Sequence, residues 1–323
     1  MSTVSLIVPC YNVEKLCDRF FESLLAQTFT DIQLIVVNDG STDGTEEKVL
    51  SYKERLENRG YKVDYVYQEN KGLGGAINTG LKHVSGEYLC WADPDDYYEN
   101  NAFEVRVEYF SKHPNCVVLT CDAYCRNIKT LDKYTLIGVN YPQRENKKQF
   151  DLLLDGRSVF CSGCHMIKFE AFKQANPQMS IYGAKRGQNW QLLLPVYFKF
   201  DRDYLSVPVY NYIKYEQSMS KGDNTKELEL FRYSEHETIL NETLRHIEET
   251  NQCDMHKYYS FVKDKYLKLR LIVALKYNDK KLFEETYLQK QKETGIDAQD
   301  RFFKFRLKHR IFNRIFNKIR GGH

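Results

Sequence analysis

Residues 91–98 read Trp-Ala-Asp-Pro-Asp-Asp-Tyr-Tyr, and they place three carboxylates within four positions directly after an apolar run, 87–92, that predicts a buried strand. Like charges at this spacing repel one another unless a cation or strong hydrogen-bond donors compensate them. Carboxylate oxygens suit hard divalent ions such as Mg²⁺ or Mn²⁺, which often share their coordination with substrate phosphates. We therefore expect a divalent metal bound by Asp95 and Asp93. The alternative is a polar turn that leads into a capped helix.

The first hundred residues alternate between strands and helices. Apolar, β-branched runs predict strands at 4–8, 34–37, 63–67 and 87–92, and the segments between them predict helices at 14–27, up to about 57, and 74–83. Strands that alternate with helices indicate a mostly parallel sheet flanked by helices. Ligands of such sheets bind at the carboxyl ends of the strands. Four polar clusters fall at those ends, namely 9–12, 39–40, 70–72 and 93–96.

The rest of the chain divides into a less regular region and a helical one. Residues 117–121 predict a return to the sheet, 122–160 read as irregular, a helix begins near 187, and 207–213 predict a strand. From residue 224 the pattern predicts helices at about 225–250, 254–276 and 279–294, and a last one from 297. We expect two domains, an α/β domain over 1–222 and a helical C-terminal extension over 223–323.

Composition points to a cytoplasmic protein. No apolar window is long enough to span a membrane, and the N-terminus has no pattern typical of a secretory signal. Nine cysteines, an odd number, are typical of reduced thiols. Cys161, Cys164 and His165 could contribute to a zinc site, but a structural zinc site needs four ligands, and buried thiols are the simpler interpretation.

The four polar clusters and their preceding strands are similar, in order and spacing, to the motifs of family 2 glycosyltransferases. The matching segments are 5–12, 35–43, 70–73 with 78–80, and 92–96. The resemblance is close over about 4–100 and loose over 101–220. It implies the GT-A nucleotide-diphospho-sugar transferase fold, a mostly parallel mixed sheet flanked by helices, followed here by the helical C-terminal extension. It also implies that 1–100 bind the nucleotide sugar and that 101–222 bind the acceptor.

The resemblance carries over a set of residues that bind the donor. Tyr11 would stack on the nucleobase, Asp39 would accept hydrogen bonds from the base or ribose, and Gly40 would permit the positive φ of the turn. Asp93 would contact the ribose, and Asp95 would hold the Mn²⁺ or Mg²⁺ that bridges the diphosphate. The full predicted donor set is Pro9, Tyr11, Asn12, Asp39, Gly40, Lys71, Gly72, Asn78, Asp93 and Pro94.

The implied reaction moves a hexose or N-acetylhexosamine, with inversion, from a nucleotide-diphosphate donor, expected to be a UDP-sugar, to a hydroxyl of a saccharide or lipid-linked saccharide. Many relatives carry a Glu-Asp pair where this chain has Gln188-Asn189, and neither amide is a useful base. The predicted catalytic residues are Asp95, Asp96, Gln188 and Asn189, and the predicted acceptor-binding residues are His165, Arg186 and Trp190.

Three outcomes stay open for this departure from the family. The two amides orient the acceptor while Asp96 or His165 takes the proton, or the hydroxyl loses its proton late to water or to the donor phosphate. Alternatively, the protein is a non-catalytic sugar-nucleotide-binding or scaffold subunit. Because the whole donor side is intact, we expect an active enzyme.

Residues 301–320 form a basic amphipathic segment with eight Lys or Arg and no acidic residue. Its apolar stripe consists of Phe305, Phe312, Ile315, Phe316 and Ile319. This pattern is typical of a helix that lies in an anionic membrane surface, here the inner face of the plasma membrane. Docking onto the protein itself or onto a partner is the alternative. Nucleic-acid binding is disfavoured, because no nucleic-acid-binding fold accompanies the segment.

Overall fold

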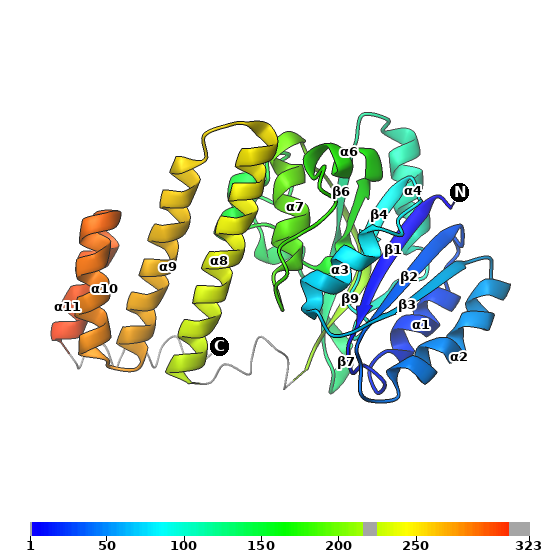
Figure 1. Ribbon diagram of the computed structural model, residues 1–323, viewed down its shortest axis with the longest axis horizontal. Coiled ribbons are helices and arrows are strands. Elements are labelled where there is room, and N and C mark those ends of the chain that lie inside the picture. Colours follow the sequence, from blue (N-terminus) through cyan, green and yellow to red (C-terminus); the bar gives the residue numbers. More distant parts are fainter. Residues whose placement is uncertain (1, 216–224, 310–323) are drawn as a thin grey trace. The chain divides into compact units, whose positions relative to one another are not determined.

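The computed structural model describes residues 2–215 and 225–309 of the 323-residue chain. It contains two compact units, residues 1–215 and 216–323 (Figure 1). The predicted domain boundary at residue 222 lies outside the described residues.

A nine-stranded mixed sheet forms the centre of the first unit, in the order β3-β2-β1-β4-β8-β6-β9-β5, with β7 paired to β6. Its first four strands are parallel, as predicted: β3 (Lys62–Gln68), β2 (Ile32–Asp39), β1 (Val4–Cys10) and β4 (Tyr88–Trp91). The antiparallel part begins with β8 (His165–Lys168), which joins β4 to β6 (Val118–Asn127). The sheet is completed by β9 (Asp203–Lys214), β5 (Tyr97–Tyr98) and β7 (Thr130–Leu136).

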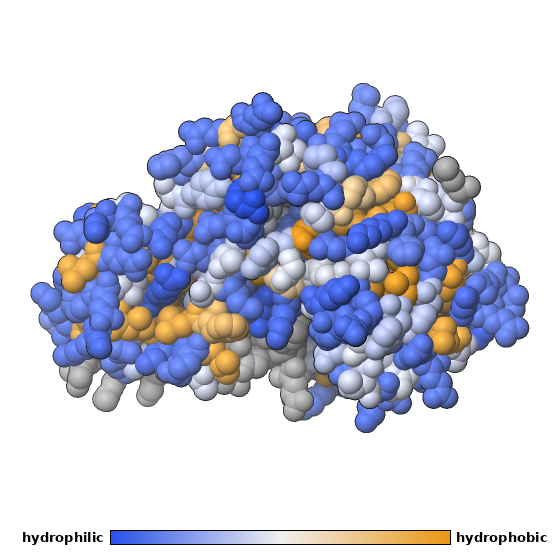
Figure 2. Space-filling model, in the orientation of Figure 1, coloured by the Kyte–Doolittle hydropathy of each residue, from blue (hydrophilic) through white to orange (hydrophobic). Residues whose placement is uncertain are grey.

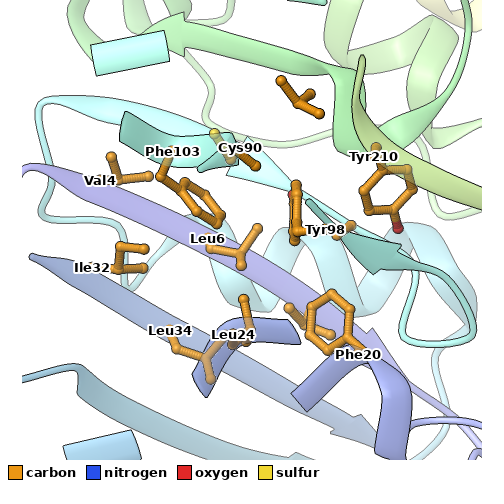
Figure 3. Close-up of a cluster of buried hydrophobic side chains, with 14 of the residues drawn as sticks. Val4, Leu6, Phe20, Leu24, Ile32, Leu34, Cys90, Tyr98, Phe103 and Tyr210 are labelled. Atoms are coloured by element: carbon orange, nitrogen blue, oxygen red, sulfur yellow. The ribbon is translucent and has the colours of Figure 1, made fainter. Parts of the chain in front are cut away.

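Helices cover both faces of this sheet. One face carries α1 (Asp18–Leu25), α2 (Thr45–Asn58) and α4 (Ala102–Lys112), and α3 (Gly72–Leu81) packs on β1 and β2. Alternate strand residues such as Val4, Leu6 and Leu34 meet Phe20 and Phe103 in one continuous core (Figure 3). Helix α3, on the opposite face, comes so close to β1 that a Cβ on Gly80 would lie 2.5 Å from Ile7 Cγ2.

The prediction that 122–160 are irregular was wrong in part. Strand β6 continues to Asn127 because it pairs along its length with β9, across a register shift at Asp122, and β7 folds back on it. A short helix, α5 (Phe150–Asp155), follows. The remaining elements of this unit are η1 (Gly138–Asn140), η2 (Ser162–Cys164), α6 (Phe169–Ala175) and α7 (Gln188–Lys199).

The second unit is helical, as predicted, with α8 (Lys226–Asn251), α9 (His256–Lys276), α10 (Lys280–Glu293) and α11 (Ala298–Lys308). Helix α9 packs against the other three. In the interior of this helical unit, the Lys290 side chain is 2% exposed, and its ammonium lies 2.5 Å from Asp264 Oδ1 and 2.9 Å from Asp300 Oδ2. These ion pairs join α9, α10 and α11. Over the described residues, no helix has the length and apolarity needed to span a membrane.

Candidate active site

The carboxyl ends of the four parallel strands bring the predicted polar clusters to one edge of the sheet. Cys10 pairs with Asn38, and Asp39 pairs with Gln68, so the segments that follow β1, β2 and β3 are neighbours. Three of these turns have positive φ, at Asn12 (52°), Gly40 (70°) and Gly72 (74°). A Cβ on Gly40 would also lie 2.7 Å from the backbone nitrogen of Asn70, so this turn requires glycine.

Asp39 joins the second cluster to the third. Its Oδ1 accepts hydrogen bonds from Gln68 Nε2 (2.5 Å) and from the backbone nitrogen of Lys71 (2.8 Å). Within the described part of the chain nothing bonds its Oδ2, which leaves this oxygen for a ligand. Tyr11, at the end of β1, is 52% exposed, so its ring can stack on a flat ligand. Pro9 beside it is half-buried.

The three carboxylates of the 93–96 turn lie in a poorly solvated position. Burial, followed by the charge of Asp95, raises the pKa of Asp93 to about 6. Burial also raises the pKa of Asp95, and burial together with the charges of its neighbours raises the pKa of Asp96 well above its usual range. A cation placed here would reverse these shifts. Pro94, between the first two carboxylates, is buried.

Asp93 is fixed by the second half of the unit. Ser162 Oγ donates a hydrogen bond to Asp93 Oδ2 (2.8 Å), Gln188 Nε2 lies 3.5 Å from Asp93 Oδ1, and the Tyr210 hydroxyl donates to the Asp93 carbonyl oxygen (3.0 Å). The Tyr215 hydroxyl similarly donates to the carbonyl oxygen of Asp95 (3.0 Å). Ser162 and Tyr215 were not among the predicted site residues, because a lone hydroxyl distant in sequence carries no pattern that marks it.

Carboxylate oxygens with raised pKa values suit Mn²⁺ or Mg²⁺. Among the described residues, no group of three His, Cys, Asp or Glu side chains is placed to hold a metal ion. A metal held by Asp95 and Asp93 would take its other ligands from phosphate and water, as Mg²⁺ commonly does.

The structure contradicts the acceptor-binding role of His165 and its alternative role as a base. The side chain is fully buried, its ring stacks on Trp91 (centroids 5.7 Å apart), and Nδ1 lies 3.0 Å from Thr120 Oγ1. Burial, together with the Arg202 and Arg106 charges, lowers the pKa of His165 to about 3. A neutral, enclosed imidazole of this kind neither reaches an acceptor nor takes its proton.

The predicted catalytic roles of Asp96 and Asn189 also do not fit the positions of their side chains. Asp96 is buried, and its Oδ1 accepts the backbone N–H of Ile213 (2.7 Å), so it anchors the turn to β9 rather than facing an acceptor. Asn189 is 6% exposed, and both ends of its amide are used internally: Oδ1 accepts from Trp91 Nε1 (2.6 Å), and Nδ2 donates to the Phe160 carbonyl oxygen (2.8 Å).

Asn12 and Asn78, two residues predicted to bind the sugar donor, instead hydrogen-bond to the backbone of neighbouring loops. Asn12 Oδ1 accepts from the backbone nitrogen of Thr42 (2.8 Å), which fixes the turn after β2. The amide of Asn78 bonds both backbone groups of Ile181, donating to the carbonyl oxygen (2.8 Å) and accepting from the nitrogen (2.7 Å). In this conformation both ends of the Asn78 amide are occupied, whereas only the oxygen of exposed Asn12 is.

Residues 181–187, here called the strap, precede α7 in the chain and pack against α3. Gln191 bonds both backbone groups of Tyr182, as Asn78 does for Ile181, and the backbone nitrogen of Gly74 donates to Ala184 (2.8 Å). The strap brings exposed Lys185 beside the Gly72 turn, and half-buried Arg186 follows it. Trp190, also half-buried, packs on Phe160, with ring centroids 5.1 Å apart.

Comparison with known proteins identifies the family of the chain. Residues 5–175 match the family model described as "Glycosyl transferase family 2". The chain belongs to this family. An uncharacterized glycosyltransferase of Rickettsia typhi is 39% identical over 153 residues, which are 47% of this chain and 45% of that protein. Glycosyltransferase GlyA of Streptococcus pneumoniae is 40% identical over 101 residues, 31% of this chain and 14% of that protein. The chain thus spans less than half the length of these curated relatives.

Solved structures of other glycosyltransferases share the fold of this family 2 member. S. aureus TarS 1–349 in complex with UDP-GlcNAc has a TM-score of 0.58 at 17% identity, covering 92% of this chain and 93% of that one. The mannosyltransferase PcManGT from Pyrobaculum calidifontis, in complex with GDP-Man and Mn²⁺, has a TM-score of 0.52 at 14% identity, covering 97% and 86%. The predicted GT-A fold is confirmed.

Proposed function

We propose that this glycosyltransferase moves a sugar from a nucleotide-diphosphate donor to an acceptor hydroxyl with the help of a divalent metal. The observation that carries the proposal is the turn at 93–96, where carboxylates with raised pKa values lie at the same sheet edge as Asp39 and the exposed ring of Tyr11. The complexes of TarS with UDP-GlcNAc and of PcManGT with GDP-Man and Mn²⁺ support this ligand chemistry.

In this proposal, different residues bind the base, the ribose and the diphosphate of the donor. Tyr11 stacks on the nucleobase, Oδ2 of Asp39 accepts a hydrogen bond from the base or ribose, and Asp93 orients the ribose. Asp95, with Asp93, holds Mn²⁺ or Mg²⁺, which when bound stabilises the charge of the departing diphosphate. Lys71 and Lys185 lie beside the Gly72 turn and add positive charge near the donor.

We propose a direct displacement with inversion. The acceptor hydroxyl attacks the anomeric carbon opposite the diphosphate, and its proton leaves late, to water or to the diphosphate. This route is favoured because His165 and Asn189 are both occupied inside the protein. The acceptor, a saccharide or lipid-linked saccharide, would lie near Arg186 and Trp190.

Association with the inner face of the plasma membrane stays a prediction. Residues 310–320 of the basic segment lie outside the described residues. In the described part, Phe302 and Phe305 are exposed, whereas Phe303 packs into the core of the helical unit. Hydrophilic residues cover most of the face seen in Figure 2, with smaller apolar areas among them. Fractionation of cells that express a chain without 310–323 tests this prediction, and an unchanged membrane fraction would contradict it.

A donor screen tests the proposed function directly. Thermal melting with UDP- and GDP-sugars should show a rise in midpoint for one nucleotide class, larger with Mn²⁺ than without it, because ligands that bind only the native state stabilise it. The selected donor should also be slowly hydrolysed. Binding without hydrolysis or transfer to any acceptor would instead support the non-catalytic subunit.

Metal binding should weaken in acid. Asp93 has a pKa of about 6, above its usual 3.8. The metal binds the ionised carboxylate, so below pH 6 each ion must displace a proton, and affinity should fall by up to about tenfold per pH unit. Calorimetric titration of Mn²⁺ between pH 7.5 and 5 in buffers of different ionisation enthalpy measures both the affinity and the protons released. An affinity that is independent of pH would contradict this prediction.

A further inference from the structure

Asn189 closes a ring of contacts beside the 93–96 turn. The ring runs from Trp91 through its indole nitrogen to Asn189 Oδ1 (2.6 Å), and from Asn189 Nδ2 to the Phe160 carbonyl oxygen (2.8 Å). Two residues further along the chain, Ser162 Oγ donates to Asp93 Oδ2 (2.8 Å), and Asp93 lies two residues after Trp91. The ring therefore joins the end of β4, the 160–162 segment and the first turn of α7.

The chemistry of the ring requires an amide at position 189. Trp91 Nε1 can only donate and the Phe160 carbonyl oxygen can only accept, so the residue between them must accept at one end and donate at the other. This requirement also fixes the orientation of the amide, since the flipped amide would oppose donor to donor and acceptor to acceptor. An aspartate would place carboxylate charge 2.8 Å from a carbonyl oxygen in a buried position.

Gln188 strengthens the same connection. Its Nε2 lies 3.5 Å from Asp93 Oδ1, so both oxygens of Asp93 face donors from the second half of the unit. A shift of α7 or of the 160–162 segment would therefore move Asp93 directly. The Gln188-Asn189 pair thus has a structural reason to be neutral that does not involve the acceptor.

We propose that Asn189 is a positioning residue, which uses its amide to hold Trp91 and the 160–162 segment so that Asp93 is oriented for the donor and metal. Position 189 then supplies no general base. The inference rests on the proposed function for its consequence, donor binding, but the hydrogen-bonded ring can be measured without it.

The first experiment observes the ring itself. The chain has only two tryptophans, Trp91 and Trp190, so a ¹⁵N-labelled protein gives two indole resonances, assigned with Trp190→Phe. Asn189→Ala should shift the Trp91 indole resonance and speed its hydrogen exchange, whereas Asn176→Ala, which alters another buried amide of the same unit, should not. An unchanged Trp91 resonance in Asn189→Ala would overturn the proposal.

The second experiment measures the consequence for Asp93. Asn189→Asp and Asn189→Ala should each weaken UDP or GDP affinity in Mn²⁺ by about 10- to 100-fold, the usual cost of losing a group that orients a metal ligand. The donor KM should rise while kcat does not increase, and Trp91→Phe should be non-additive with Asn189→Ala. Asn176→Ala controls for lost stability and should keep wild-type donor affinity.

Two results would contradict the positioning role. An Asn189→Asp enzyme with unchanged donor affinity and a kcat raised more than tenfold would show that position 189 is the site of a base. Additive effects of Trp91→Phe and Asn189→Ala on donor affinity would show that the two side chains act separately. If the wild-type chain binds no nucleotide, the proposed function is wrong, and so is the proposed role of Asn189 in orienting Asp93. The indole spectra would still test whether the hydrogen-bonded ring exists.

Discussion

Replacing Asp95 with asparagine should reduce sugar transfer by about 10³-fold, because the metal that neutralises the departing diphosphate would lose its principal protein ligand, a contribution of several kcal/mol. Asparagine keeps the size of the side chain and removes its charge. The initial rate with saturating donor and calorimetric Mn²⁺ titration measure the effect. Asp151→Asn, on the exposed face of α5, is the matched control and should leave both quantities unchanged.

The same variant separates lost chemistry from lost folding. Because burial raises the pKa of Asp95 in the native state, the unfolded chain releases this proton more readily, and ionisation favours unfolding at neutral pH. Asp95→Asn should therefore melt, without metal, at a temperature no lower than wild type, but should lose the stabilisation by Mn²⁺. Full activity of this variant in Mn²⁺ would contradict the role of Asp95.

The second large effect is expected in the helical unit, where Lys290→Met should lower the free energy of unfolding by about 3–5 kcal/mol. The methionine fills similar space but leaves fully buried Asp300 without its counter-ion, and it removes one of the two lysines paired with Asp264, which keeps Lys268 at 3.0 Å. Lys290 Nζ also donates to the Gly295 carbonyl oxygen (2.9 Å), so the turn after α10 would lose a contact as well. Urea unfolding monitored by circular dichroism measures the change.

Two further variants identify the cause. Arg245→Met removes exposed ion pairs with Glu242 and Glu249 and should cost no more than about 1 kcal/mol. Adding Asp300→Asn to Lys290→Met should recover part of the stability, because it removes the uncompensated charge. Equal losses in Lys290→Met and Arg245→Met would show that the buried pairs contribute little.

The parallel strands β1, β2 and β4 were predictable because they are short, largely apolar and buried on both faces. Such strands give continuous β-branched runs, as in Ile32–Asp39, and the turns between them carry glycine or asparagine where φ is positive. The continuation of β6 beyond residue 121 and the whole of β7 were missed, because these segments are half-exposed and polar at their outer ends. Arg126 illustrates this: its guanidinium lies 5.0 Å from the ring centroid of Tyr124 and 4.8 Å from that of Tyr134, contacts that arise only after the strands have paired.

The site could be predicted from the sequence only where the order of the strands determines which segments lie close together. Parallel strands bring Asp39 and the 93–96 turn to one edge, so their proximity follows from topology. Whether a polar side chain faces that edge or the interior depends on packing by distant residues. His165 is enclosed because Trp91 covers its ring, and Asn189 because Phe160 offers a carbonyl oxygen. No sequence pattern separates these side chains from exposed ones.

The strap of residues 181–187 is anchored almost wholly through main-chain atoms. Asn78 and Gln191 each bond the backbone N–H and carbonyl oxygen of one strap residue, and the backbone nitrogen of Gly74 adds a fifth hydrogen bond, so the strap's path does not depend on the side chains of Tyr182 or Lys185. Exchanging those two residues should therefore alter which ligands the protein accepts while the backbone keeps its course. This makes positions 182 and 185 natural places at which specificity could be redesigned.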